Sequence, residues 1–333
     1  MVCRTNIKIL IVCFIFLVGI KEAPATSFYI IVDKLGSKVK VKTPVKRAII
    51  VTSYEIIPAL NIWNQIAGVS RWVEEYCDLY KAFVKIDPKL KKPEVGTGTD
   101  LNIEAILKLN PDVVIIWTYD VEVIKFLEKK GITVIGIYPD TLDDLYNLIN
   151  MYGKLFGKEK RAKRVIEKMN EIFSLIKKRV SEIPLQKRKK VVYLLTKPTT
   201  ISCKIGVTND LIELINAINL GGEIKKRYAD VSVEKIIKWD PDIIFIWGNA
   251  GYDESWLYNN SQWKFIKAVE NHKVYKLPDW SNWSPRAALL ALYMAIKTYP
   301  EKFKDINFEK IANKFYKEVF GISYYEVKKY ERN

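Results

Sequence analysis

The 333-residue sequence contains one histidine and four cysteines. The histidine, His272, lies near a predicted surface turn, and the cysteines occur in no metal-ligand spacing. Cys3 and Cys13 belong to the N-terminal leader, so we expect Cys77 and Cys203 to be idle thiols rather than a disulfide. Sites for free zinc or manganese need several His or carboxylate ligands. The sequence therefore disfavours such a site, although a bare ferric-iron site of tyrosines and carboxylates stays open.

Long apolar segments are also scarce. The apolar run over residues 9–20 spans about twelve residues, too few for a comfortable permanent helix across ~30 Å of hydrocarbon. Arg4 and Lys8 precede this run, and a small-x-small cleavage site at residues 23–25 follows it. We predict an export signal over residues 1–25, either cleaved or retained as an anchor. The rest of the chain is expected to be extracytoplasmic, soluble or tethered at the outer face of the cytoplasmic membrane.

Acidic residues are outnumbered, and the formal net charge is +16. A basic surface can attract nucleic acid, an anionic envelope or an anionic ligand. Here the lysines are spread along nearly every predicted helix, and the one dense cluster, residues 187–190, precedes a predicted strand as a solvated turn. An exported protein meets little nucleic acid. We interpret the charge as a solvated surface with a bias toward anionic ligands, not as a nucleic-acid site.

Short apolar strands alternate with helical segments from Lys46 onward, which is typical of α/β architecture. The apolar runs that predict strands are 48–51, 66–69, 113–117, 133–137, 191–195, 243–247 and 273–277. The helical segments include 54–63, with Ser53 as its cap, and 121–130, 210–218, 285–298 and 308–320.

One long helical segment divides this pattern. From Lys158 to about Val180, apolar residues recur on a single helical face, and Pro184 closes the segment. At 1.5 Å per residue it spans roughly 35 Å. We therefore predict two Rossmann-like α/β lobes joined by a single long backbone helix. The boundaries are residues 27–157 for the N-terminal lobe, 158–183 for the connecting helix and 184–333 for the C-terminal lobe with a terminal helix.

An internal repeat relates the two halves. Residues 101–117 match residues 231–247, and each copy reads as a cap, a short helix, a Pro-Asp turn and a buried strand that ends in tryptophan. Ligands of open α/β sheets bind beyond the carboxyl ends of the strands, so Trp117 and Trp247 are candidates for one shared cleft. The alternative is that each tryptophan only plugs the top of its lobe.

The repeat also places a glutamate, Glu104 or Glu234, in the first turn of each short helix. A carboxylate near a helix N-terminus gains ~0.3–1 kcal/mol from the macrodipole, which is a sufficient local explanation. The functional alternative is a matched pair of surface handles, because a two-fold partner needs equivalent contacts on each lobe.

The segment 278–286 combines two tryptophans, Trp280 and Trp283, with Arg286 at a predicted helix start. Aromatic walls plus a fixed guanidinium suit a bulky, ring-rich, partly anionic ligand. The alternative is a buried tryptophan pair with Arg286 in a structural salt bridge.

Weaker candidates lie in the loops of the N-terminal half. Tyr54 begins the first predicted helix, Trp72 follows a strand, and Tyr119 continues the loop after Trp117. Each follows a predicted strand, so all three are assigned to the rim of the same cleft.

These features together resemble the ABC-importer receptors for ferric siderophores, haem and vitamin B12, over residues 47–303. The resemblance implies the helical-backbone, class III periplasmic-binding-protein fold. It further implies that Glu104 and Glu234 dock on arginines of the permease, and that Trp117 and Trp280 line the cleft. Trp72 falls where the vitamin B12 receptor has a tyrosine. Gly98 stands where that receptor has a further cleft tryptophan, which weakens a corrinoid assignment.

The expected function is capture of an iron chelate of the siderophore or haem type, and delivery to an ABC permease dimer with cytoplasmic ATPase subunits. The resemblance implies a monomer peripheral to the membrane, without catalytic residues, an intrinsic cofactor or a protein-borne metal. A corrinoid receptor and a bare metal-ion receptor stay open as alternatives. A two-lobed metal chelatase is the enzyme alternative, which the export signal and the single histidine disfavour.

Overall fold

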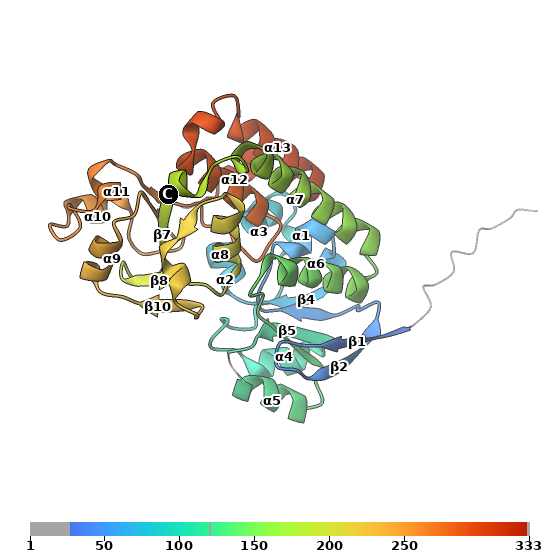
Figure 1. Ribbon diagram of the computed structural model, residues 1–333. Helices are drawn as coiled ribbons and strands as arrows, with labels where there is room; N and C mark the ends of the chain where they lie inside the picture. Colours follow the sequence, from blue (N-terminus) through green and yellow to red (C-terminus); the bar gives the residue numbers. More distant parts are fainter. Residues whose placement is uncertain (1–26, 120, 332–333) are drawn as a thin grey trace, which may run out of the picture.

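The computed structural model describes residues 27–119 and 121–331 (Figure 1). The predicted export signal and its two cysteines lie outside the described residues. The predicted two-lobed α/β fold is confirmed: two separate sheets are connected through one long helix. No helix within the described ranges combines the length and apolar character needed to cross a bilayer.

The N-terminal lobe contains a four-stranded parallel sheet with strand order β4-β3-β5-β6. Its strands are buried on both faces, as the near-continuous Val and Ile runs require. The strands are β3 (Ala48–Ile50), β4 (Ile66–Val69), β5 (Val113–Trp117) and β6 (Val134–Ile137). The helices are α1 (Ile56–Leu60), α2 (Trp72–Tyr76), α3 (Asp78–Ile86), α4 (Ile103–Leu109), α5 (Val121–Lys129) and α6 (Leu142–Phe156), with short 3-10 turns at Trp63–Gln65 and Pro88–Leu90.

An antiparallel hairpin precedes this sheet. It consists of β1 (Ser27–Val32) and β2 (Lys38–Thr43), and Gly36 occupies its turn with a positive φ of 81°. The hairpin packs its inner face against the lobe through β2 and α6.

The C-terminal lobe contains a mixed sheet with order β10-β8-β7-β11-β12, and β9 also pairs with β7. Strands β7, β9, β11 and β12 pair in parallel, whereas β8 pairs antiparallel with both β7 and β10 and so runs against the other five. The strands are β7 (Lys190–Leu194), β8 (Thr200–Ser202), β9 (Ile218–Asn219), β10 (Tyr228–Asp230), β11 (Ile243–Ile246) and β12 (Val274–Lys276). The helices are α8 (Val207–Leu214), α9 (Val233–Trp239), α10 (Glu254–Asn259), α11 (Lys267–Glu270), α12 (Ala287–Thr298), α13 (Phe308–Val319) and α14 (Tyr324–Lys328), with 3-10 turns at Leu185–Lys187, Leu220–Glu223 and Pro300–Lys302.

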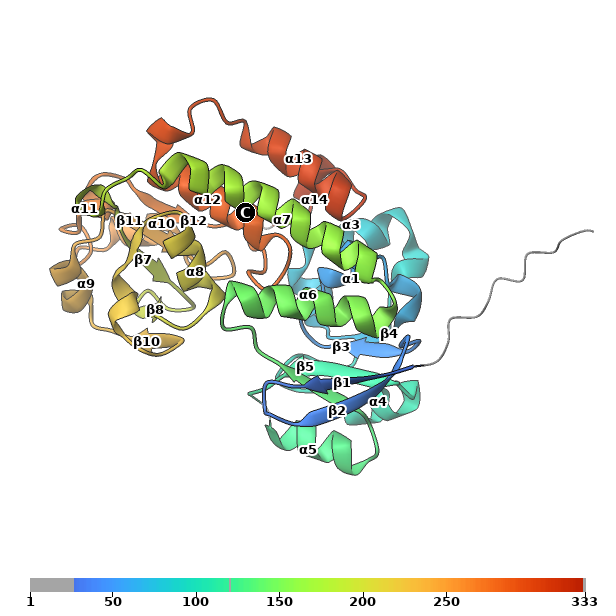
Figure 2. The same cartoon turned by 45° about the vertical axis from the view of Figure 1, so that its right-hand side comes forward.

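The long helix α7 (Glu159–Val180) has 22 residues and therefore spans ~33 Å. It packs on α6 and α1 of the N-terminal lobe and on α12, α13 and α8 of the C-terminal lobe (Figure 2). Its buried face, which includes Val165, Met169 and Phe173, belongs to one hydrophobic core with residues of both lobes. Because sliding the lobes apart would expose this shared core, the fold favours small hinge motions.

The internal repeat has the same local structure in both lobes. Asn102 caps α4 by accepting the N–H of Ala105 at 2.9 Å, and Ser232 caps α9 by accepting the N–H of Lys235 at 3.2 Å. Both helices end in a left-handed residue, with φ of 43° at Asn110 and 47° at Asp240. A central parallel strand follows in each lobe, so the repeat builds the same helix–strand unit twice.

Two helices begin two residues later than predicted. Ser53 adopts a left-handed conformation with φ 58°, and α1 begins at Ile56 without a side-chain cap. Ser284 and Pro285 likewise form a turn before α12, which begins at Ala287. In both places the chain turns sharply after a strand before it becomes helical. Ser53 of the first turn lines the space between the lobes, and the Ser284 hydroxyl of the second turn bonds to Glu55.

Candidate functional site

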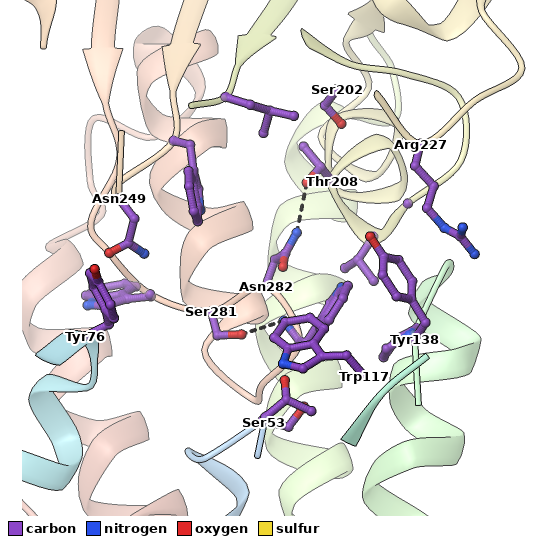
Figure 3. Close-up of a pocket in the computed structure, with 18 of the residues that line it drawn as sticks. Ser53, Tyr76, Trp117, Tyr138, Ser202, Thr208, Arg227, Asn249, Ser281 and Asn282 are labelled. Atoms are coloured by element: carbon purple, nitrogen blue, oxygen red, sulfur yellow. Dashed lines mark hydrogen bonds between the residues drawn. The ribbon is translucent and has the colours of Figure 1, made fainter. Parts of the chain in front are cut away.

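A cavity of about 580 Å³ lies between the two lobes (Figure 3). From the N-terminal lobe it receives the segments that follow β3, β4, β5 and β6, and from the C-terminal lobe those that follow β7, β11 and β12. The carboxyl ends of parallel strands in both sheets thus turn toward one space, which is where open α/β sheets bind ligands. Its volume falls within the ~300–1,000 Å³ range of small-molecule sites.

Tyrosine and tryptophan side chains dominate the lining of this cavity. The rings of Trp117 and Trp283 approach to 4.5 Å between centroids, and those of Tyr138 and Trp283 to 4.7 Å. Because Trp283 precedes α12, whereas Trp117 ends β5 and Tyr138 follows β6, this cluster joins the lobes. The lining aromatic residues are Tyr54, Trp72, Tyr76, Trp117, Tyr119, Tyr138, Tyr193, Tyr228, Trp247, Trp280 and Trp283.

The structure brings most of the predicted ligand residues together around this space. Those that line the cavity are Tyr54, Trp72, Trp117, Tyr119, Trp247, Trp280 and Trp283. Trp280 contributes little surface, because its residue is only 1% exposed and its Nε1 donates to Glu331 Oε1 at 3.0 Å. The hydroxyl of Tyr54 donates to the carbonyl oxygen of Val51 at 2.6 Å, so its ring rather than its oxygen faces a ligand.

The prediction that Arg286 contacts the ligand requires correction. Arg286 is fully buried and does not line the cavity. Its Nε donates to Glu55 Oε2 at 2.8 Å, its Nη1 donates to Asp78 Oδ2 at 2.8 Å and to the Tyr316 hydroxyl at 3.0 Å, and its Nη2 pairs with Glu55 Oε1. The guanidinium is therefore held by two buried carboxylates, which is the structural alternative that the sequence left open.

This charged network lies beneath the cavity and ties the lobes together. Burial alone would lower the pKa of Arg286, but Asp78 and Glu55 raise it well above its ordinary value. Glu55 also accepts the backbone N–H of Ser281 at 3.2 Å and a bond from the Ser284 hydroxyl. Since Glu55 and Asp78 come from the N-terminal lobe and the other partners from the loop before α12 and from α13, the network fixes the cavity floor.

Three polar atoms of the lining have no hydrogen-bond partner among the described residues. They are Ser53 Oγ, Trp117 Nε1 and Asn249 Oδ1, each buried from water. Ser53 is only 5% exposed as a residue. Leaving a buried polar group unpaired costs ~1–3 kcal/mol. Because water does not reach these atoms from the cavity, a bound molecule can pair with them only after the lining rearranges.

Arg227 is a cavity residue that the sequence analysis missed. It donates two bonds to Asp140, from Nε to Oδ1 at 2.6 Å and from Nη2 to Oδ2 at 2.9 Å, across the boundary between the lobes. Its guanidinium carbon lies 4.2 Å from the ring centroid of Tyr138. Partial burial alone would raise the pKa of Asp140, but Arg227 and Lys34 hold it below its ordinary value. Both the Arg227 guanidinium and the Asp140 carboxylate are thus charged at neutral pH.

Other missed residues follow strands directly. Tyr138 comes immediately after β6 and Asn249 shortly after β11, while Asn282 lies in the loop after β12 and donates to Thr208 Oγ1 at 2.9 Å. The signal that could have found the first two is their place just beyond the carboxyl end of a buried strand. Arg227 carries no such signal, because its segment forms a loop before β10.

The lining offers poor ligands to a bare metal ion. Burial raises the pKa of the Cys77 thiol, so it remains protonated. Within the described ranges, no group of three or more His, Cys, Asp or Glu side chains is arranged to hold a metal ion. Cys77 and Cys203 are both buried and unpaired with each other.

The two repeat glutamates lie outside the cavity. Glu104 on α4 and Glu234 on α9 are exposed, each in the first turn of its helix. Bonds from its own backbone N–H and from the Ser232 hydroxyl lower the pKa of Glu234. The two carboxylates thus occupy equivalent surface positions on the two lobes.

The chain is similar to known binding proteins in both sequence and structure. The family model described as "Periplasmic binding protein" matches residues 50–280. The chain is 26% identical to the molybdate-binding protein MolA of Haemophilus influenzae over 89% of this chain and 92% of that protein. A crystal structure of Helicobacter pylori CeuE with a nickel–histidine complex superposes with a TM-score of 0.81 at 30% identity, covering 92% of this chain and 100% of that one. The iron(3+)-hydroxamate-binding protein FhuD of Bacillus subtilis is 29% identical over 55% of this chain and 60% of that protein.

Proposed function

The chain belongs to the periplasmic binding protein family, and we propose that it is an extracytoplasmic receptor that captures a metal chelate for an ABC importer. The observation that carries this proposal is the aromatic cavity enclosed by the strand ends of both lobes. Its walls suit capture without chemistry: they offer flat apolar faces and a few polar atoms for orientation.

A preformed chelate fits this lining better than a free ion. Tyr54 and Tyr193 line the cavity, and burial raises the pKa of both phenols, so neither is a ready phenolate ligand. The protonated Cys77 thiol adds no ligand either. A metal that enters this space therefore has to bring its own coordination shell, which favours a chelate over the bare metal-ion alternative.

The charges around the cavity favour a neutral or cationic chelate. Although the chain carries a net charge of +16, no lysine is found among the described residues of the lining, and Arg227 is the one basic residue among them. That arginine is already paired with Asp140, just as the lining carboxylate of Glu55 is paired with Arg286, and the carboxylate of Asp279 also lies in the lining. A polyanion would lose its hydration here without gaining a free cation in return. The cavity therefore favours neutral or cationic ligands, rather than the anionic ligands that the net charge of the sequence suggested.

An iron–hydroxamate complex is the chelate that best combines these properties. Hydroxamate chelates fill the coordination shell of iron and can be neutral or cationic, and the similar FhuD is a hydroxamate-binding protein. A compact oxyanion is the second candidate, because the Ser53 hydroxyl and the Trp117 Nε1–H are donors without a partner among the described residues, and the similar MolA is a molybdate-binding protein. The size and aromatic character of the cavity favour the chelate.

We assign docking on the permease, which delivers the ligand, to the two exposed glutamates. Glu104 and Glu234 occupy equivalent positions on α4 and α9, so they can meet equivalent groups on a two-fold permease dimer driven by cytoplasmic ATPase subunits. In Figures 1 and 2, α4 lies low in the N-terminal lobe and α9 at the left of the C-terminal lobe, both away from α13. Neither glutamate touches the cavity, so docking and capture use separate surfaces.

The test is a tryptophan-fluorescence titration with three ferrioxamine B derivatives that share one iron centre. The parent has a free ammonium group, the N-acetyl derivative is neutral, and the N-succinyl derivative has a carboxylate; molybdate completes the panel. We expect saturable quenching by the first two at sub-micromolar concentration and binding at least ~10-fold weaker for the third, about the effect of 1.4 kcal/mol. Failure of all three iron complexes contradicts the chelate proposal. Tightest binding of the succinyl derivative contradicts only the charge argument.

A further inference from the structure

The outer face of the β1–β2 hairpin combines an apolar row with a basic row. In β1 the side chains alternate, so that Phe28, Ile30 and Val32 point outward and are 61%, 63% and 65% exposed. Three large apolar side chains in one row are more than the scattered exposed residues that any surface contains. This row belongs to neither the cavity nor the core.

The basic row lies directly beside the apolar one. The register pairs Phe28 with Lys42, Ile30 with Lys40 and Val32 with Lys38, and all three lysines are exposed. Residues that are directly opposite in an antiparallel pair share a face of the sheet. The Lys40 ammonium lies 4.3 Å from the ring centroid of Phe28, so the two rows are in contact. We call these six residues the hairpin face.

Protection of a sheet edge explains only part of this arrangement. Lysines discourage unwanted strand pairing, but exposed apolar side chains do the reverse. Apolar groups next to basic groups instead match the two layers of a lipid surface, in which anionic headgroups overlie acyl chains. The hairpin face thus has the chemistry of a membrane contact.

The position of the hairpin in the chain agrees with such a contact. Residues 9–20 form the apolar run predicted to be an export signal or anchor, and Phe28 follows only eight residues after it. Eight residues reach at most ~29 Å when fully extended. A retained anchor would hold the hairpin near the bilayer surface. Both views show the hairpin at the same end of the N-terminal lobe as α4 and α5.

We propose that the hairpin face rests on an anionic phospholipid surface, with the apolar row reaching the boundary between headgroups and acyl chains and the three lysines among the phosphates. This contact orients the receptor on the membrane and does not depend on which ligand fills the cavity. Lysines near an anionic surface are attracted over about a Debye length, ~8 Å at physiological salt, so the contact has to be close.

The test places an environment-sensitive fluorophore on the hairpin face of the full chain. The background variant replaces Cys3 and Cys13 by serine, and the other two cysteines are buried. Ile30→Cys carries the probe, and Tyr325→Cys on α14, whose side chain is also exposed, carries it in the control. With vesicles that contain phosphatidylglycerol, we expect a blue shift at position 30 and none at position 325. With pure phosphatidylcholine, we expect a much smaller shift.

A charge-reversal pair separates local contact from overall charge. Reversing the three lysines of the hairpin face to glutamate should weaken the vesicle contact by at least ~100-fold, given the roughly fivefold attraction of each lysine. The matched control, Lys310→Glu with Lys314→Glu and Lys317→Glu, makes the same change in net charge on exposed positions of α13 and should leave the contact intact.

Three results would overturn the proposal. The first is an unshifted probe at position 30 with both kinds of vesicle. The second is an equal loss in the α13 control. The third is a blue shift without lipid that grows with protein concentration, since that would mean a second copy of the chain covers the hairpin face.

Discussion

Substituting Arg286 by methionine should destabilise the protein without abolishing ligand binding. The side chain of methionine has similar length but no charge, so the change removes the guanidinium that Glu55 and Asp78 share. Both carboxylates are nearly inaccessible to water, with 4% and 1% residue exposure. The variant therefore leaves two buried negative groups without their cation.

The expected loss in the free energy of unfolding is about 3–5 kcal/mol, the usual cost of removing one partner of a buried ion pair. The lower end is favoured, because Glu55 retains the N–H of Ser281 and the hydroxyl of Ser284 as donors. The loss includes part of the coupling between the lobes, since the network joins α1 and α3 to the start of α12.

Urea unfolding followed by circular dichroism measures this loss through the transition midpoint at constant m-value. The matched control is Arg71→Met, which breaks an ion pair with Glu94 whose two side chains are 50% and 49% exposed. Exposed pairs contribute ~0–1 kcal/mol, so the control should shift the midpoint only slightly. At a temperature where both variants are folded, the affinity for ferrioxamine B should change little.

Equal midpoint shifts in the two variants would refute the assignment of Arg286 to a buried structural network. Loss of ligand affinity in Arg286→Met with unchanged stability would show instead that the guanidinium faces the ligand.

Three further predictions concern Glu331, the two surface glutamates and Trp283. Burial raises the pKa of Glu331 to about 7, above its ordinary value of 4.5, so the folded state binds this proton more tightly than the unfolded state does. The free energy of unfolding should therefore fall as the pH rises from about 4.5 to 7. Glu331→Gln should flatten this pH dependence in urea titrations, and an unchanged pH dependence would contradict the assignment. Glu104→Lys combined with Glu234→Lys should abolish stimulation of the importer ATPase while ligand affinity stays intact, and a fall in affinity would argue against the docking role. Trp283→Ala should weaken chelate binding by about 1–3 kcal/mol, whereas Trp256→Ala on the surface should not; equal effects would mean that the cavity is not the binding site.

The sequence predicted the repeated units well because each is locally determined. Residues 101–117 and 231–247 contain their own caps and Pro-Asp turns. The long helix α7 has a single apolar face over 22 residues, so its periodicity is also sufficient. The strands of the hairpin carry an equally local signal, because exposed and buried side chains alternate along both β1 and β2.

The partners of charged side chains could not be predicted in this way. Arg286 was placed correctly near a helix start, yet Glu55 and Asp78 lie 231 and 208 positions away in the chain. Arg227 and Asp140 are 87 positions apart and meet only because the lobes close on each other. Such pairings depend on tertiary packing, which periodicity and capping do not encode.

The most direct test of the receptor account is a crystal structure grown with ferrioxamine B and analysed by anomalous scattering at the iron edge. The account predicts one strong iron peak between the lobes, beside the rings of Trp117 and Trp283 and with no protein atom in its coordination shell. A peak on the outer surface, or an iron atom bound directly by protein side chains, would contradict it.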